Sequence, residues 1–142
     1  MGKKRIVKKG SSGAESGGRA STKVSKKKLI SGTLHVQATF NNTKAVLTDK
    51  AGNAVLSSSS GALGFKGAKK GTPFAASKVG ELLAEKAEVL GLEDIDVVIR
   101  GVGSGREPTV RAFIARGYEL TGIRDETPVP HNGPKAKKPR RV

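Results

Sequence analysis

A glycine-rich turn followed by arginines is the most suggestive chemical pattern in this sequence, and the chemistry it suggests is anion binding. Gly101 to Gly105 stands between a predicted strand and a predicted helix, with Arg106 at its end and Arg111 close by. Backbone amides at the start of a helix favour an anion such as a nucleic-acid phosphate. The glycine spacing does not complete a dinucleotide fingerprint, and the lysine of a P-loop is missing. A polymer phosphate, a structural tight turn and a small nucleotide all stay open as interpretations.

A second glycine-rich segment, Gly64 to Gly71, has neither helical nor strand periodicity. It carries three positive charges, on Lys66, Lys69 and Lys70. Without a periodic pattern, it is interpreted either as a loop with a function or as a flexible connector.

Aromatic side chains are few, with four phenylalanines and one tyrosine. Phe40, Phe74 and Phe113 are predicted to lie in the core, which leaves Phe65 as the only candidate to stack on a base. Recognition of a nucleic acid would then rest on phosphate contacts and on folded RNA shape.

The charge of the chain is concentrated at its two ends. The 142 residues carry 27 Lys and Arg against 12 Asp and Glu, a formal net charge of +15. Residues 1–28 hold ten basic side chains and one acid, residues 128–142 hold five and none, and the middle is almost neutral. One such tail is readily interpreted as a solubilising segment, but two around one small neutral domain favour a polyanionic partner.

Catalytic groups do not converge in this sequence. A metal-dependent nuclease needs several carboxylates around one or two ions, and Asp49 has no evident companions. Glu81, Glu85 and Glu88 fall three to four residues apart beside lysines, the pattern of a solvated helix face. With no cysteine and only two histidines, neither a nucleophile with its base nor a histidine metal cluster is expected. We therefore expect no enzymatic activity, no cofactor, no metal and no small-molecule substrate.

Neither a transmembrane helix nor a secretory signal is expected. The chain has no run of 18 apolar residues, and its N-terminus is basic without an apolar segment. The absence of cysteine fits a reducing compartment. The expected location is the cytosol, without a membrane partner.

Hydrophobic periodicity predicts one α/β domain over residues 29–127, between two basic extensions that are disordered in isolation, at 1–28 and 128–142. Two helices are predicted, the first capped by Thr72 and ended by Gly91, the second ended by Gly117. The order β-β-β-α-β-α-β predicts a mixed sheet with helical cover, and the apolar fourth strand predicts cover on both faces. The five predicted strands lie at residues 34–40, 43–48, 54–57, 95–99 and 118–125.

Four segments together resemble a known family. They are Phe40-Asn41-Asn42-Thr43, the run from Gly64 to Ala76, the turn from Gly101 to Glu107, and the ending Thr127 to Gly133 before the Lys/Arg tail. In these segments, and over about residues 30 to 142, the chain resembles the bacterial small-subunit ribosomal protein eleven, or S-eleven, family. The first 28 residues are similar to the variable basic extension of that family.

The resemblance implies a ribonuclease-H-like mixed sheet of five strands with two helices, used without ribonuclease chemistry. It also implies a cytoplasmic ribosomal protein on the platform of the small subunit, near the messenger RNA path at the exit site and the Shine-Dalgarno helix. The implied partners are the small-subunit ribosomal RNA and ribosomal proteins seven and eighteen. The RNA-binding residues expected on this basis are Asn41, Asn42, Lys44, Lys66, Lys69, Lys70, Arg106, Arg111, His131, Asn132, Lys137, Lys138, Arg140 and Arg141. For the two turn asparagines, a purely backbone role is the open alternative.

Two functions of other classes share some of these features. A free nucleoid-type protein or general RNA chaperone would share the charge and the tails, but no basic amphipathic helix that reads DNA is visible. A nuclease would share the implied fold, but it would need carboxylates that this chain lacks.

Overall fold

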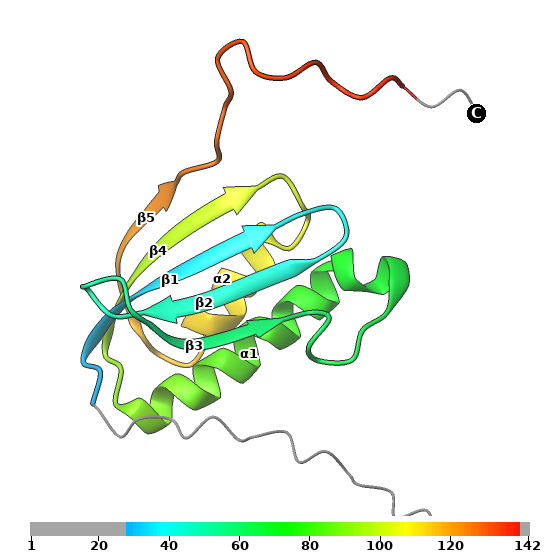
Figure 1. The fold of residues 1–142 in the computed structure, drawn as a ribbon. Helices are drawn as coiled ribbons and strands as arrows, with labels where there is room; N and C mark the ends of the chain where they lie inside the picture. Colours follow the sequence, from blue (N-terminus) through cyan, green and yellow to red (C-terminus); the bar gives the residue numbers. More distant parts are fainter. Residues whose placement is uncertain (1–27, 140–142) are drawn as a thin grey trace, which may run out of the picture.

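The computed structural model describes residues 28–139, in which five strands and two α-helices follow one another in the predicted order (Figure 1). The predicted α/β fold is confirmed. The extension at 1–28, apart from Lys28, and the arginines at positions 140 and 141 lie outside the described residues. The strands are β1 Ser31–Ala38, β2 Thr43–Thr48, β3 Ala54–Ser59, β4 Asp94–Gly101 and β5 Glu119–Asp125; the helices are α1 Pro73–Leu90 and α2 Arg106–Ile114, with a short 3₁₀ helix, η1, at Gly67–Gly71.

The sheet is mixed, as the element order predicts. Its strand order is β3-β2-β1-β4-β5. β1 pairs antiparallel with β2, and β2 pairs antiparallel with β3, because short turns connect them. β1 and β4 are parallel, as are β4 and β5, and each of these pairs is linked through a helix.

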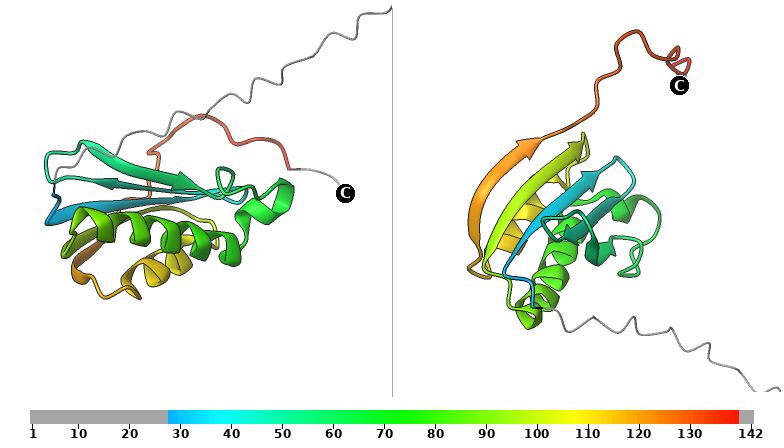
Figure 2. Two further views of the ribbon diagram at one scale, coloured as in Figure 1. Left: turned by 90° about the horizontal axis from the view of Figure 1, so that it is seen from below. Right: turned by 60° about the vertical axis from the view of Figure 1, so that its left-hand side comes forward.

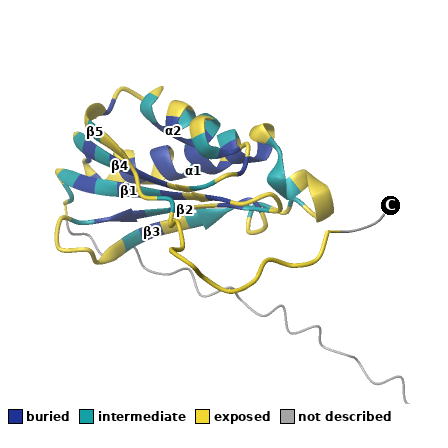
Figure 3. Ribbon diagram, turned by 90° about the horizontal axis from the view of Figure 1, so that it is seen from above, coloured by how far each residue is buried: buried dark blue, intermediate teal, exposed yellow. Residues whose placement is uncertain are grey.

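Both helices pack on the same face of the sheet (Figure 2). Alternate strand residues such as Leu34, Val36 and Val97 point toward the helices and are fully or almost fully buried, together with Phe113 of α2 (Figure 3). The prediction that helices cover both faces at the fourth strand is wrong. Val98 alternates with the inward-pointing Val97, so it lies on the face without helices, where it lines the same hollow as His35 and Val46 and is almost fully buried.

The ends of α1 are set by the residues that the sequence indicates. The Thr72 side chain accepts a hydrogen bond from the Ala75 amide at 3.4 Å, and Pro73 occupies the first turn. The helix ends at Gly91, whose φ of 78° is a left-handed conformation that residues other than glycine rarely adopt. This cap directs the chain back into β4.

Two of the predicted core residues are not in the core. Phe40 is 79% exposed, because β1 ends at Ala38 and the chain turns at Thr39 before the alternation reaches it. Phe74 is 63% exposed, because in the first turn of α1 the neighbouring Ala75 and Ala76 take the inward positions. Both phenylalanines lie where loops meet at one end of the sheet.

Candidate nucleic-acid interface

Three loops meet at the end of the sheet where β1 and β4 finish. They comprise residues 39–42, 60–72 and 102–105, and together they are called the loop end (Figure 1). The Gly103 amide donates to the Ala38 carbonyl at 3.0 Å, and the Ser104 hydroxyl donates to the Gly71 carbonyl at 2.8 Å. Parallel strands bring their carboxyl ends to one edge, so loops far apart in the sequence form one surface.

Glycines allow these loops to touch through their backbones. A Cβ on Gly71 would lie 3.0 Å from the Phe40 carbonyl carbon, and one on Gly103 would lie 2.8 Å from the Thr39 carbonyl carbon. Gly105 is similarly tight against Thr43. Of the interpretations of the turn from Gly101 to Gly105, structural tight packing therefore accounts for the glycines directly.

The lysines of the second glycine-rich segment lie on the loop end. Lys66 precedes η1, and Lys69 and Lys70 belong to it; the first two are exposed and Lys70 is half-buried. Among residues 28–139, no carboxylate forms an ion pair with any of the three. The three loops themselves contain no Asp or Glu. Their ammonium groups are thus available to an external anion.

The turn that carries Asn41 and Asn42 is closed by other groups. The Thr39 amide and hydroxyl both donate to the Asn42 carbonyl, at 2.8 and 3.0 Å, and the Asn42 amide donates to the Thr39 hydroxyl at 3.1 Å. Neither asparagine has a positive φ, so left-handed backbone does not explain them. Asn41 is exposed, whereas the side-chain oxygen of Asn42 is buried without a hydrogen-bond partner in the described structure. Of the two, Asn41 is the better placed to contact a ligand.

Arg106 is engaged with acceptors of its own chain. Its guanidinium donates to the Gly101 carbonyl, to the Thr127 hydroxyl at 3.3 Å and to the Asp125 carboxylate at 2.5 Å. These contacts tie the start of α2 to the end of β5, from which the C-terminal arm leaves. Arg111 has different neighbours: it is exposed on α2, 3.6 Å from Glu107. The two arginines therefore do not form one anion site in this structure.

Asp125 is expected to stay ionised well below neutral pH. The Thr127 hydroxyl, and next to it the Arg106 guanidinium, lower the pKa of the Asp125 carboxyl from 3.8 to about 2. Because the folded-state pKa is depressed, its stabilising contribution is complete above about pH 4 and disappears as the pH falls through about 2. Carboxyl-carbon NMR should give a titration midpoint near 2, and Arg106→Gln should move it upward. A midpoint at the ordinary value in the wild-type chain would contradict the clamp.

The remaining predicted ligands lie away from η1. Lys44 is exposed on the face of the sheet without helices, beside a hollow of about 140 Å³ that His35 and Arg100 also line. In the C-terminal arm, His131, Asn132, Lys137 and Lys138 are all exposed. The structure thus presents these side chains on surfaces next to the loop end or beyond β5, and it does not gather them into one pocket.

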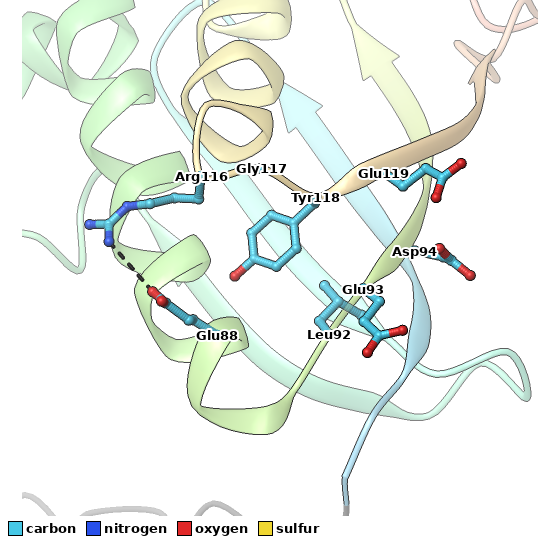
Figure 4. Close-up of a pocket in the computed structure, with 8 residues that line it drawn as sticks. All are labelled: Glu88, Leu92, Glu93, Asp94, Arg116, Gly117, Tyr118 and Glu119. Atoms are coloured by element: carbon cyan, nitrogen blue, oxygen red, sulfur yellow. Dashed lines mark ion pairs between the residues drawn. The ribbon is translucent and has the colours of Figure 1, made fainter.

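A hollow at the opposite end of the molecule is lined by four acidic side chains. It has a volume of about 340 Å³ and lies where α1 ends and β4 and β5 begin (Figure 4). Among the described residues that line it, Arg116 is the only cation, and it pairs with Glu88 at 3.6 Å. The acids that line it are Glu88, Glu93, Asp94 and Glu119. These acids disfavour a polyanion in this hollow, whereas the lysines of the loop end favour one there.

The sequence of this chain also matches a family model. The model for ribosomal protein S11 covers residues 32–141, which is most of the chain and includes all three loops. The chain belongs to the ribosomal protein S11 family. This is a family of structural proteins of the small ribosomal subunit that bind ribosomal RNA, contact other ribosomal proteins and serve translation. The resemblance seen in the sequence motifs is thereby confirmed at the level of the family.

Of the aromatic residues at this end, the sequence analysis singled out Phe65 but wrongly assigned Phe40 and Phe74 to the core. Phe40 and Phe74 are exposed at the loop end, and Phe65 packs edge-on against Phe74 with ring centroids 6.1 Å apart. The Lys78 ammonium lies 5.6 Å from the centre of the Phe74 ring. The signal that was available for Phe40 is its position directly before the Asn-Asn turn, outside the strand proper.

Within residues 28–139, no three His, Cys, Asp or Glu side chains come together in a way that could hold a metal ion. Within the same residues, neither helix combines the length and the apolar character needed to cross a membrane.

Proposed function

We propose that this chain is an RNA-binding constituent of the platform of a bacterial small ribosomal subunit in the cytoplasm. In this proposal it lies near the exit-site messenger RNA path and the Shine-Dalgarno helix, with ribosomal proteins seven and eighteen as neighbours. Family membership supports the small subunit and the ribosomal RNA as its setting. The finer location is supported by the close resemblance of its motifs to the bacterial members.

One observation carries the RNA-binding part: the loops of this end contain no Asp or Glu, and their three lysines form no ion pair with a carboxylate of residues 28–139. Lys66, Lys69 and Lys70 can each neutralise a backbone phosphate, and the basic arm beyond β5 adds to them. Such contacts fix position and affinity without reading sequence, which suits a protein that recognises one folded RNA by its shape.

Replacing Lys66, Lys69 and Lys70 by alanine together should weaken binding to protein-free small-subunit ribosomal RNA. Each lost phosphate contact lowers the slope of log affinity against log salt by about 0.7 to 0.9, so we expect a slope smaller by roughly 2. The melting temperature should change little, because two of the three side chains are exposed and none forms an ion pair with a described residue. Filter binding across a salt series and thermal unfolding measure the two effects.

The matched control replaces three exposed lysines elsewhere, Lys28, Lys50 and Lys86, and so changes the net charge equally. If it lowers the slope as much as the loop-end variant does, the charge acts only through the overall field and the interface is wrongly located.

The location in the cell is tested by sedimentation of a cell lysate. On sucrose gradients the wild-type chain should follow small subunits at low magnesium and whole ribosomes at high magnesium, and it should cross-link to proteins seven and eighteen. Migration with the nucleoid would favour the free nucleic-acid-binding alternative.

A further inference from the structure

Three of the four phenylalanines lie in the loop end or next to it: Phe40 and Phe65 in its loops, and Phe74 in the first turn of α1. Of the four in the sequence, only Phe113 is fully buried, whereas Phe40 and Phe74 are largely exposed and Phe65 is half-buried. Single exposed apolar side chains are common on protein surfaces. Three side chains of one aromatic type in or next to the loops that carry Lys66, Lys69 and Lys70 are instead a concentrated feature, which suits a partner with both apolar and anionic groups.

The backbone that carries Phe40 is held on several sides. Behind it, β1 is paired with both β2 and β4. The turn is closed by the hydrogen bonds between Thr39 and Asn42, and Gly71 packs directly against the Phe40 carbonyl group. A side chain on such a fixed turn loses little backbone entropy when it binds, so contact with its ring is favoured.

The ring of Phe40 has no aromatic partner in residues 28–139, unlike the other phenylalanines. Phe65 and Phe74 pair edge-on with one another, and Phe113 packs against Tyr118 with centroids 4.8 Å apart. With 79% of its surface exposed, Phe40 can accept a flat group against its face. Flat groups that come attached to phosphates are the bases of a nucleic acid.

We infer that Phe40 stacks on an unpaired base of the small-subunit ribosomal RNA, while the neighbouring lysines contact the phosphates on either side of that nucleotide. This inference rests on the proposed function and narrows its ligand to a looped-out or single-stranded segment at this point. The absence of Asp and Glu from all three loops favours RNA over a basic protein surface as the occupant. An apolar patch of a neighbouring ribosomal protein is the competing occupant that the experiment has to distinguish.

Fluorescence offers a direct test, because the chain contains no tryptophan. In the full-length Phe40→Trp variant the single indole should lose most of its emission when protein-free small-subunit ribosomal RNA is added. The control, Val89→Trp, places an indole at an 86% exposed position near the far end of α1, and its emission should stay constant. Quenching of both variants alike, or of neither while RNA binds, would overturn the inference.

Affinity measurements on two further variants show whether the aromatic ring of Phe40 itself contributes to RNA binding. Phe40→Tyr keeps an aromatic face and should bind the same RNA as well as the wild-type chain does. Phe40→Leu should bind about ten-fold or more weakly, with an unchanged salt slope, because a stack is lost and no phosphate contact is. If Phe40→Leu binds normally while the loop-end lysine variant is weakened, the stacking inference fails and the proposed function stands. If the wild-type chain itself does not bind the RNA, both fail.

Discussion

Deleting residues 128–142 should give the largest loss of RNA affinity of any change considered. The segment carries five basic side chains and no acid, and its described part, residues 128–139, is exposed throughout. If all five cations contact phosphates, the slope of log affinity against log salt falls by roughly 4, since each contact contributes about 0.7 to 0.9. The fold should survive, because Thr127 and the contacts of Arg106 with it and with Asp125 are retained. Binding to protein-free small-subunit ribosomal RNA from low to moderate salt measures the loss.

A charge-neutral arm is the matched control for this deletion. Replacing the five Lys and Arg of residues 128–142 by glutamine keeps the length and removes the charge, so it should reproduce most of the change in slope. If the glutamine variant binds as tightly as the wild-type chain, the arm acts through its shape and not through its cations. An unchanged slope in the deletion itself would remove the arm from the RNA interface.

Most of the fold could be predicted because its signals are local. The alternation of Leu34 and Val36 with polar residues is enough to predict a half-buried strand, and Thr72 with Pro73 is enough to start α1. The ends of the strands were predicted less accurately. β1 finishes at Ala38, two residues before its predicted end, and β3 continues to Ser59, two residues past its predicted end. Turn hydrogen bonds decide these ends, and periodicity does not report them.

The candidate site was predicted less completely, because long-range contacts decide it. Arg106 was expected to face an anion beside Arg111, but Asp125 occupies its guanidinium from 19 residues away along the chain. Phe40 was predicted to be buried because it continues the alternation of inward-pointing residues in β1, from Leu34 to Ala38. The strand ends at Ala38, so the alternation no longer determines where the Phe40 side chain points. The lysines of η1 could be singled out because their charge lies within a run without periodicity. That no carboxylate of residues 28–139 pairs with them could not be predicted, because it depends on how the loops assemble.

Gly103→Ala should destabilise the domain strongly, because the added Cβ would meet the backbone of the 39–42 loop. An added Cβ would lie 2.8 Å from the Thr39 carbonyl carbon and 2.9 Å from the Ala38 carbonyl carbon, both of them backbone atoms that cannot rotate away. The Gly103 amide also bonds to the Ala38 carbonyl, so separating the loops loses that hydrogen bond. Overpacking of this kind costs about 1 to 3 kcal/mol. For a domain of this size, that corresponds to a melting temperature lower by roughly 5 to 20 °C.

Gly122→Ala is the matched control for this substitution, because its Cβ would meet only the Asp96 side chain, at an ordinary 3.5 Å. Calorimetry should find the melting temperature of Gly122→Ala close to that of the wild-type chain and the melting temperature of Gly103→Ala well below it.

Gly103→Ala should also weaken RNA binding by more than its smaller folded fraction explains, because the turn that carries Asn41 and Phe40 packs against Gly103 and Gly71. If Gly103→Ala melts like the control, the backbone contact between the 39–42 and 102–105 loops does not hold the loop end together. The glycine at position 103 would then need another explanation, such as the close approach of a bound phosphate.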